Sequence, residues 1–172
     1  MLHGEKVLLR ARTDADVSVL HVGMYEDVVT RSRSDEGPWK PVSLDSGESP
    51  FRIKPRADAA VFSVVETAGD QLAGSALLWG IDFHNRVAHI GMGLLPAFRG
   101  RGLGTDVVAV LCRYAFTTLG LRRVQLETLA DNVAMTKAAV RNGFLHEGTL
   151  RSNAWENGEF LDEVIYGRLV TD

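Results

Sequence analysis

Three of the chain's 17 glycines fall within five residues of one another: Gly100, Gly102 and Gly104. Residues 87–95, just before them, have the apolar pattern of a strand, and residues 103–115 repeat apolar side chains at helical spacing. Glycines at such a junction permit backbone conformations in which successive N–H groups point into one concavity. The helix N-terminus adds about half a positive charge. This junction predicts an anion site suited to a phosphate or pyrophosphate.

The flanking residues restrict the type of phosphate site. Arg99 and Arg101 add two full charges to the turn. A Walker A loop is excluded, because no Gly-Lys-Ser/Thr follows the glycines. The dinucleotide pattern G-x-G-x-x-G fails at its third glycine, where Thr105 stands, although Glu127 could mimic the ribose-binding acid of that class. A nicotinamide site and a glycine-rich turn without a ligand stay open as alternatives.

Composition excludes several other classes. A length of 172 residues fits a single domain. The formal charge of −3 argues against a general nucleic-acid binder, and the single cysteine, Cys112, excludes an intrachain disulfide and fits a small core residue. The longest apolar run, 107–112, is far shorter than the roughly 20 residues that span a bilayer. With no apolar signal core at the N-terminus, we expect a cytoplasmic protein with no membrane partner.

The first third of the chain predicts a strand, a helix and a long loop. The strand covers 5–12, and Thr13 caps a helix whose apolar stripe is Val17, Leu20, Met24 and Val28. Residues 31–50 contain several prolines and glycines and predict an irregular segment with room for a helical turn. Trp39 within it either clamps a ligand or pins the loop to the body.

The rest of the chain predicts a mixed α+β order. The elements are an antiparallel meander of strands at 60–66, 72–81 and 87–95, a helix over 103–115 that Gly120 ends, a strand at 122–128, a helix from Asn132 to Arg141, and a hairpin of strands at 144–154 and 159–169. Asn157-Gly158 is the strongest short signal for the hairpin turn.

The glycine turn and several later residues together resemble the GNAT acyltransferase superfamily. Its acyl-CoA signature, Q/R-x-x-G-x-G/A, is matched by Arg99, Gly102 and Gly104. The tail is similar to that of the Rim-type branch, the ribosomal-protein-alanine N-acetyltransferases. The residues that carry this second likeness are Val7 to Arg10, Asp14, Asp16, Asn132, Gly143-Phe144, Glu147-Gly148, Leu150-Arg151, Gly158, Asp162 and Tyr166. The likeness covers nearly the whole chain and is weakest over 27–58.

The resemblance implies a fold and a cofactor site. The fold is a mixed, mostly antiparallel sheet flanked by helices and splayed between its fourth and fifth strands, and the pantetheine arm of acetyl-CoA lies in that gap like an added strand. Backbone contacts to it are implied at Met92, Gly93, Leu94 and Leu95. The pyrophosphate is implied on the N–H groups of Arg99, Gly100, Arg101, Gly102, Leu103, Gly104 and Thr105. Asn132 bonds the cofactor with Lys137 nearby, or else Asn132 is only a helix cap and Lys137 only a surface charge.

The implied activity is N-acetyl transfer by direct attack of a primary amine on acetyl-CoA. The acceptor is a protein N-terminus or a small-molecule amine, and the resemblance also implies a homodimer. The alternatives are an acyl-CoA-binding module with weak or no catalysis, and a transferase of a longer acyl group such as succinyl. The acceptor pocket is expected between the first helix, the 31–50 loop and the terminal hairpin, with Met24, Trp39 and Trp155 as liners.

The catalytic residues are less clearly marked in the sequence. An alkylammonium with a pKa near ~10 must lose a proton before it attacks, and the candidate base is Glu127, which otherwise is an exposed or ion-paired carboxylate. The resemblance implies that the N–H of Leu94 stabilises the thioester oxygen. Family members often place a Ser or Tyr acid where this chain has Met135 and Ala139, and neither can donate a proton. His84 and His89 fit surface or packing roles, and no metal-ligand spacing occurs, so no metal is expected.

Overall fold

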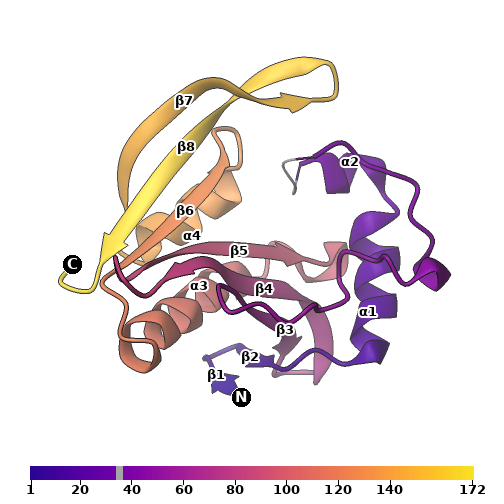
Figure 1. The fold of residues 1–172 in the computed structure, drawn as a ribbon, viewed down its shortest axis with the longest axis horizontal. Helices are drawn as coiled ribbons and strands as arrows, with labels where there is room; N and C mark the ends of the chain where they lie inside the picture. The colour runs from indigo at the N-terminus through magenta and orange to yellow at the C-terminus, as the bar shows by residue number, and fades with distance from the viewer. Residues whose placement is uncertain (34–36) are drawn as a thin grey trace.

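An eight-stranded sheet forms the body of this computed structural model, which describes residues 1–33 and 37–172 (Figure 1). Every neighbouring pair is antiparallel except β5 and β6, which are parallel. In spatial order the strands are β1 (Leu2–His3), β2 (Val7–Arg10), β3 (Ala60–Glu66), β4 (Gln71–Asp82), β5 (Val87–Leu94), β6 (Arg123–Leu129), β8 (Glu159–Leu169) and β7 (Leu145–Glu156). The predicted α+β class and the mostly antiparallel sheet are confirmed.

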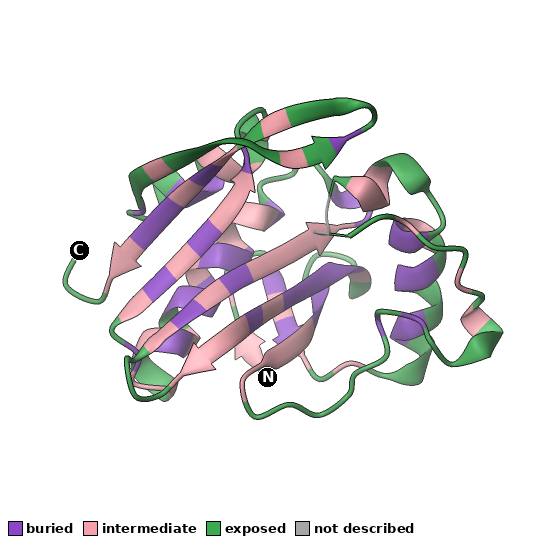
Figure 2. Cartoon of the chain, turned by 45° about the horizontal axis from the view of Figure 1, so that its top comes forward, coloured by how far each residue is buried: buried purple, intermediate pink, exposed green. Residues whose placement is uncertain are grey.

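Helices cover both faces of the sheet (Figures 1 and 2). The α3 helix packs on one face, because a Cβ on Gly104 would lie 3.3 Å from Met92 Cε. On the other face, a Cβ on Gly93 would collide with Met24. The helical segments are α1 (Asp14–Leu20), the π-helical turn η1 (His21–Tyr25), α2 (Val28–Ser32), the 3-10 turns η2 (Leu44–Ser46) and η3 (Pro96–Phe98), α3 (Leu103–Arg113), the π-helical turn η4 (Tyr114–Thr118) and α4 (Val133–Arg141).

The N-terminal region departs from prediction in two places. The strand predicted over 5–12 is only β2, because the Gly4 N–H donates to the Val7 carbonyl and closes a turn after the short strand β1. The predicted helical stripe fails at Val28, which is 45 % exposed. A π-turn holds an extra residue, so it rotates every later side chain around the helix axis. Asp27 then caps a separate helix, α2.

The predicted loop over 31–50 begins inside α2 and contains the 3-10 turn η2. Residues 34–36 of that prediction lie outside the described part of the chain. Trp39 packs on the body: its indole N–H donates to the Tyr25 carbonyl at 2.9 Å, and its ring lies 6.3 Å from the Tyr25 ring. The pinning interpretation of Trp39 agrees with these contacts.

The second half of the chain follows the prediction closely. Gly120 has φ 64° after the helix, which runs past 115 as the turn η4, and the Asn132 side chain accepts from the Met135 N–H at 3.2 Å as a cap. Asn157 and Gly158 both have positive φ, as the hairpin turn requires. Cys112 is buried in the core, and burial raises the pKa of its thiol to about 11. No helix in the described residues is long and apolar enough to cross a membrane.

A buried carboxylate ties α1 to the sheet. Asp16 accepts from both terminal guanidinium nitrogens of Arg10 at 2.6 and 2.8 Å, from the Thr13 N–H at 2.8 Å and from the Ser63 hydroxyl at 2.9 Å. The Arg10 hydrogen bonds hold the pKa of Asp16 well below its usual range. Asp16 and Thr13 form a capping box at the start of α1. Through the Arg10 and Ser63 bonds, the Asp16 carboxylate also anchors the helix to β2 and β3.

Replacing Asp16 with alanine is expected to lower the free energy of unfolding by about 2–3 kcal/mol, because it leaves the partly buried Arg10 cation, the Thr13 N–H and the Ser63 hydroxyl without this acceptor. Denaturant unfolding of Asp16→Ala measures this, and Asp14→Ala is the control, since the Asp14 side chain is almost fully exposed. The folded-state pKa is depressed, so the stabilisation is fully present above about pH 4 and is lost as the pH falls through that pKa. Equal losses in both variants would contradict this role.

Candidate active site

The parallel strands β5 and β6 separate partway along their length. Their pairing runs only from Val87 opposite Arg123 to Ile90 opposite Leu126. Beyond that point β5 continues to Leu94 and β6 to Leu129 with no further pairing between them. The resulting gap is the predicted splay between the fourth and fifth strands, counting β1 and β2 as one (Figure 1).

The backbone of β5 presents free groups to this gap. The Leu95 N–H donates to the Ala73 carbonyl at 2.9 Å, which directs the odd-numbered residues of β5 toward β4. Met92 and Leu94 therefore turn their backbone groups toward β6, beyond the last β6 pair. The Leu94 carbonyl accepts from Arg99 Nε at 3.0 Å, and the Leu94 N–H is the donor left facing the gap. Backbone contacts to the cofactor were predicted at four residues, Met92 to Leu95. The backbone groups of two of them, Gly93 and Leu95, are directed toward β4 instead.

The glycine turn lies at the end of this gap. Gly100 and Gly102 have φ of 73° and 79°, a left-handed conformation that favours glycine. Gly102 is the N-cap of α3, and no side chain caps the helix there. The first N–H groups of α3, at Leu103, Gly104 and Thr105, thus lack intrahelical partners. These free N–H donors lie at the positive end of the α3 dipole, at the place where the sequence predicts an anion site.

Three cations surround the turn. Arg101 pairs with the buried Glu66 at 2.9 Å and lies over the Phe98 ring, so its charge is already balanced within the fold. Arg99 is exposed beside the turn. Lys6 reaches the turn as well, with Nζ 3.4 Å from the Arg101 carbonyl. Sequence reasoning missed Lys6, because nothing local connects it to a turn almost a hundred residues away.

Asp106, in the first turn of α3, holds Lys6 in place. Its carboxylate accepts from the N–H groups of Glu5, Lys6 and Val7 at 3.2, 2.7 and 2.9 Å. A Cβ on Gly4 would collide with this carboxylate. The start of β2 and the start of α3 are therefore fixed to each other.

Asn132 and Lys137 follow β6 on the other side of the gap. Besides capping α4, Asn132 donates from Nδ2 to Thr128 Oγ1 at 2.9 Å, which directs its amide between β6 and α4. Lys137 is exposed on α4. Ala139 is fully buried in the core and Met135 is partly buried against it.

Glu127 lies on the sheet face opposite α3, one residue beyond the last β5–β6 pair. It accepts from Gln125 Nε2 at 2.5 Å, and the same oxygen lies 3.5 Å from His89 Nδ1. The side chains of Glu127 and His89 are 24 % and 26 % exposed, so both are accessible from this face. His84, by contrast, is in the exposed β4–β5 turn.

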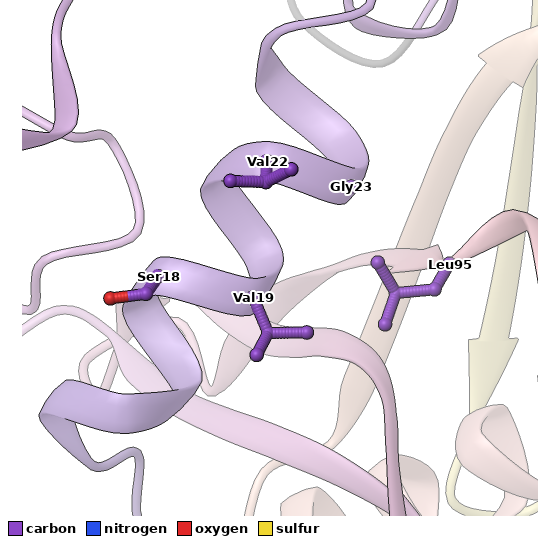
Figure 3. Close-up of a pocket in the computed structure, with 5 residues that line it drawn as sticks. All are labelled: Ser18, Val19, Val22, Gly23 and Leu95. Carbon is purple, nitrogen blue, oxygen red and sulfur yellow. The ribbon is translucent and has the colours of Figure 1, made fainter.

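The predicted acceptor-side liners are dispersed. Met24 lies over Gly93 on the same face as Glu127. Trp155 is 62 % exposed on β7 and packs edge-to-face on Phe160. Beside Leu95, a shallow apolar hollow of about 510 Å³ is lined by Ser18, Val19, Val22, Gly23 and Leu95 (Figure 3). Within 1–33 and 37–172, no three His, Cys, Asp or Glu residues are grouped as metal ligands.

Comparisons with known proteins agree with this geometry. A family model described as an acetyltransferase (GNAT) domain matches residues 6–145. An N-acetyltransferase of Bacillus subtilis, YoaA, is 25% identical over 96% of this chain and 94% of its own length, and the spermidine N(1)-acetyltransferase of Vibrio cholerae is 28% identical over 91% and 89%. The solved structure of RimL, a ribosomal L7/L12 alpha-N-protein acetyltransferase in complex with CoA, superposes with a TM-score of 0.83 at 24% identity, over 96% of this chain and 95% of RimL.

Proposed function

This chain belongs to the GNAT acetyltransferase family and is an N-acetyltransferase, and we propose that residues 1–172 act as a single domain moving an acetyl group from acetyl-CoA to a primary amine. The observation that carries the proposal is the gap between β5 and β6, with the free Leu94 N–H beside the uncapped start of α3. Likeness to RimL, solved with CoA, supports the choice of cosubstrate.

The residues around the gap fit acetyl-CoA. Met92 and Leu94 would pair with the pantetheine arm, as an added strand does. The N–H groups from Arg99 to Thr105 would hold the pyrophosphate, with Lys6 and Arg99 adding charge. Asn132 would bond the cofactor, with Lys137 nearby. When bound, the cosubstrate supplies the acetyl thioester.

The chain's own groups would perform two tasks in direct attack. The Leu94 N–H would donate to the thioester oxygen as negative charge develops on it. Glu127 would take a proton from the acceptor ammonium, directly or through water, so that the nitrogen lone pair can attack. Thiolate is a tolerable leaving group, because free thiols have pKa values of about 8.5. The missing acid at Met135 and Ala139 is therefore compatible with turnover.

The names of the relatives support a proposal for the acceptor class. One relative is named for spermidine and a structural neighbour for the N-terminal amine of a ribosomal protein, so we propose a small-molecule amine or a protein N-terminus. The homodimer and the cytoplasmic location stay predictions. A CoA-binding module with weak catalysis is the second candidate, because neither Met135 nor the buried Ala139 can protonate the leaving thiolate.

Release of free thiol from acetyl-CoA tests the proposal. The protein is mixed with acetyl-CoA and either spermidine, an unblocked peptide with an N-terminal serine or alanine, or no acceptor. We expect amine-dependent thiol release at tens of times the acceptor-free rate or more. CoA binding by calorimetry without turnover on any acceptor would favour the binding module. The same assay with succinyl-CoA in place of acetyl-CoA measures which of the two acyl groups the protein transfers.

A further inference from the structure

A row of side chains crosses the sheet face that carries Glu127. Arg123 donates from Nη1 to Glu147 Oε1 at 2.8 Å and from Nη2 to Gln125 Oε1 at 3.0 Å. Gln125 in turn donates from Nε2 to Glu127 Oε1 at 2.5 Å, and His89 Nδ1 lies 3.5 Å from that oxygen. The row thus runs from β7 through β6 to β5.

The hydrogen bonds along this row can run in only one direction, from Arg123 through Gln125 to Glu127. A guanidinium is purely a donor and an ionised carboxylate purely an acceptor. The Gln125 amide between them must therefore turn its oxygen to Arg123 and its nitrogen to Glu127. Rotating the amide by 180° would face donor with donor and acceptor with acceptor. Arg123 therefore fixes the amide that holds Glu127.

The backbone accommodates the far end of the row. Gly167 of β8 pairs with Gln125 and lies between β6 and β7. A Cβ at Gly167 would collide with the Glu147 carboxylate. The glycine therefore leaves the space through which Glu147 crosses β8 to reach Arg123. This ion pair raises the pKa of Arg123 and lowers that of Glu147.

The end of the row at Glu127 and His89 lies where β5 and β6 stop pairing. His89 is opposite Gln125, and the last pair is Ile90 with Leu126, so Glu127 is the first β6 residue past the pairing. The His89 ring stacks on Trp79 at 4.3 Å, and within residues 1–33 and 37–172 its buried Nδ1 has no hydrogen-bond partner. Gln125 Nε2 and His89 Nδ1 both approach Glu127 Oε1. No hydrogen bond or ion pair joins Oε2 to another side chain in the described part of the chain, so Oε2 is the oxygen available to a ligand.

We propose that Gln125 and Arg123 are positioning residues that hold Glu127 so that Oε2 receives the primary ammonium of the acceptor, beside the His89 and Trp79 rings. This inference rests on the proposed function. Oε2 takes one ammonium proton and passes it to solvent. The nitrogen lone pair then forms the bond to the acetyl carbon as the carbon–sulfur bond breaks, and the second nitrogen proton goes to the leaving sulfur.

The first test follows the side-chain carboxyl carbon of Glu127 by carbon-13 NMR, with the signal assigned by its absence in Glu127→Gln. In Gln125→Leu the Glu127 carboxylate loses its hydrogen-bond donor, so its carboxyl signal is expected to move by more than its line width at constant pH. Gln71→Leu, at the exposed start of β4, is the matched control. A Glu127 carboxyl signal unchanged in Gln125→Leu would overturn the positioning role.

The second test uses hexylammonium as the probe, with hexanol as its uncharged counterpart. Hexylammonium is expected to shift the Glu127 carboxyl and His89 ring signals saturably, with roughly tenfold weaker binding in Gln125→Leu. Equal responses to both compounds, or equal affinity in both proteins, would overturn the ammonium site. Neither measurement needs CoA or turnover. Failure of the proposed function therefore appears in the thiol-release assay, and failure of this inference in the NMR titrations.

Discussion

Replacing Gly102 with valine is expected to weaken CoA binding at least about 100-fold, which is about 2.7 kcal/mol. Gly102 has φ 79° at the start of α3, where a β-branched residue is strongly disfavoured. Relaxing that strain turns away the N–H groups that would hold the pyrophosphate, and a side chain there also crowds Lys6 Nζ, 3.3 Å from the Cβ position. Titration calorimetry with CoA measures the loss.

The matched control is Gly120→Val. Gly120 also has a left-handed backbone, with φ 64°, but it lies past the opposite end of the α3–η4 segment. It should lose similar stability in denaturant unfolding and keep its affinity for CoA. Normal CoA binding by Gly102→Val, or an equal loss of binding in both variants, would exclude the turn as the phosphate site.

The Glu127→Gln enzyme is expected to lose about 100- to 1000-fold in kcat/KM for the amine while its affinity for CoA is unchanged. The amide keeps the size of the carboxyl group and removes its capacity to take a proton. The loss should shrink as the pH approaches the pKa of the amine, near ~10, because more acceptor is then already neutral. Kinetics from about pH 6 to 10, with CoA titrations alongside, measure both effects.

Asp58→Asn makes the same change of carboxyl to amide at an exposed ion pair with Arg56, away from the gap. It should leave kcat/KM unaltered. If Glu127→Gln kept full activity across the pH range, another group or water alone would have to accept the proton.

The sequence predicted the features that depend on local chemistry. Thr13, Asn132 and the Asn157-Gly158 turn satisfy or redirect backbone groups within a few residues of themselves, so their roles follow from neighbouring sequence. The alternation of side chains along β6 likewise puts Gln125 and Glu127 on one face of the sheet. Where the pattern depends on one extra residue, as in the π-turn before Val28, apolar spacing gave the wrong face.

Contacts between distant segments were beyond local patterns. The place of Lys6 at the glycine turn and that of His89 beside Glu127 depend on strand order and on the parallel register of β5 and β6. Periodicity identifies strands but not their neighbours. The splay itself was predicted through family resemblance, since no residue type marks the point where two strands stop pairing.

The Asp106 carboxylate bears on the order in which parts of the protein fold. Its bonds to the N–H groups of Glu5, Lys6 and Val7 close chain segments of 99 to 101 residues. Closing so long a segment costs entropy that local contacts do not offset early in folding. The end of the molecule that carries the proposed phosphate site should thus fold late, and a ligand bound there would stabilise the finished fold by mass action. Cellular CoA would then influence how much of this enzyme survives as well as how fast it works.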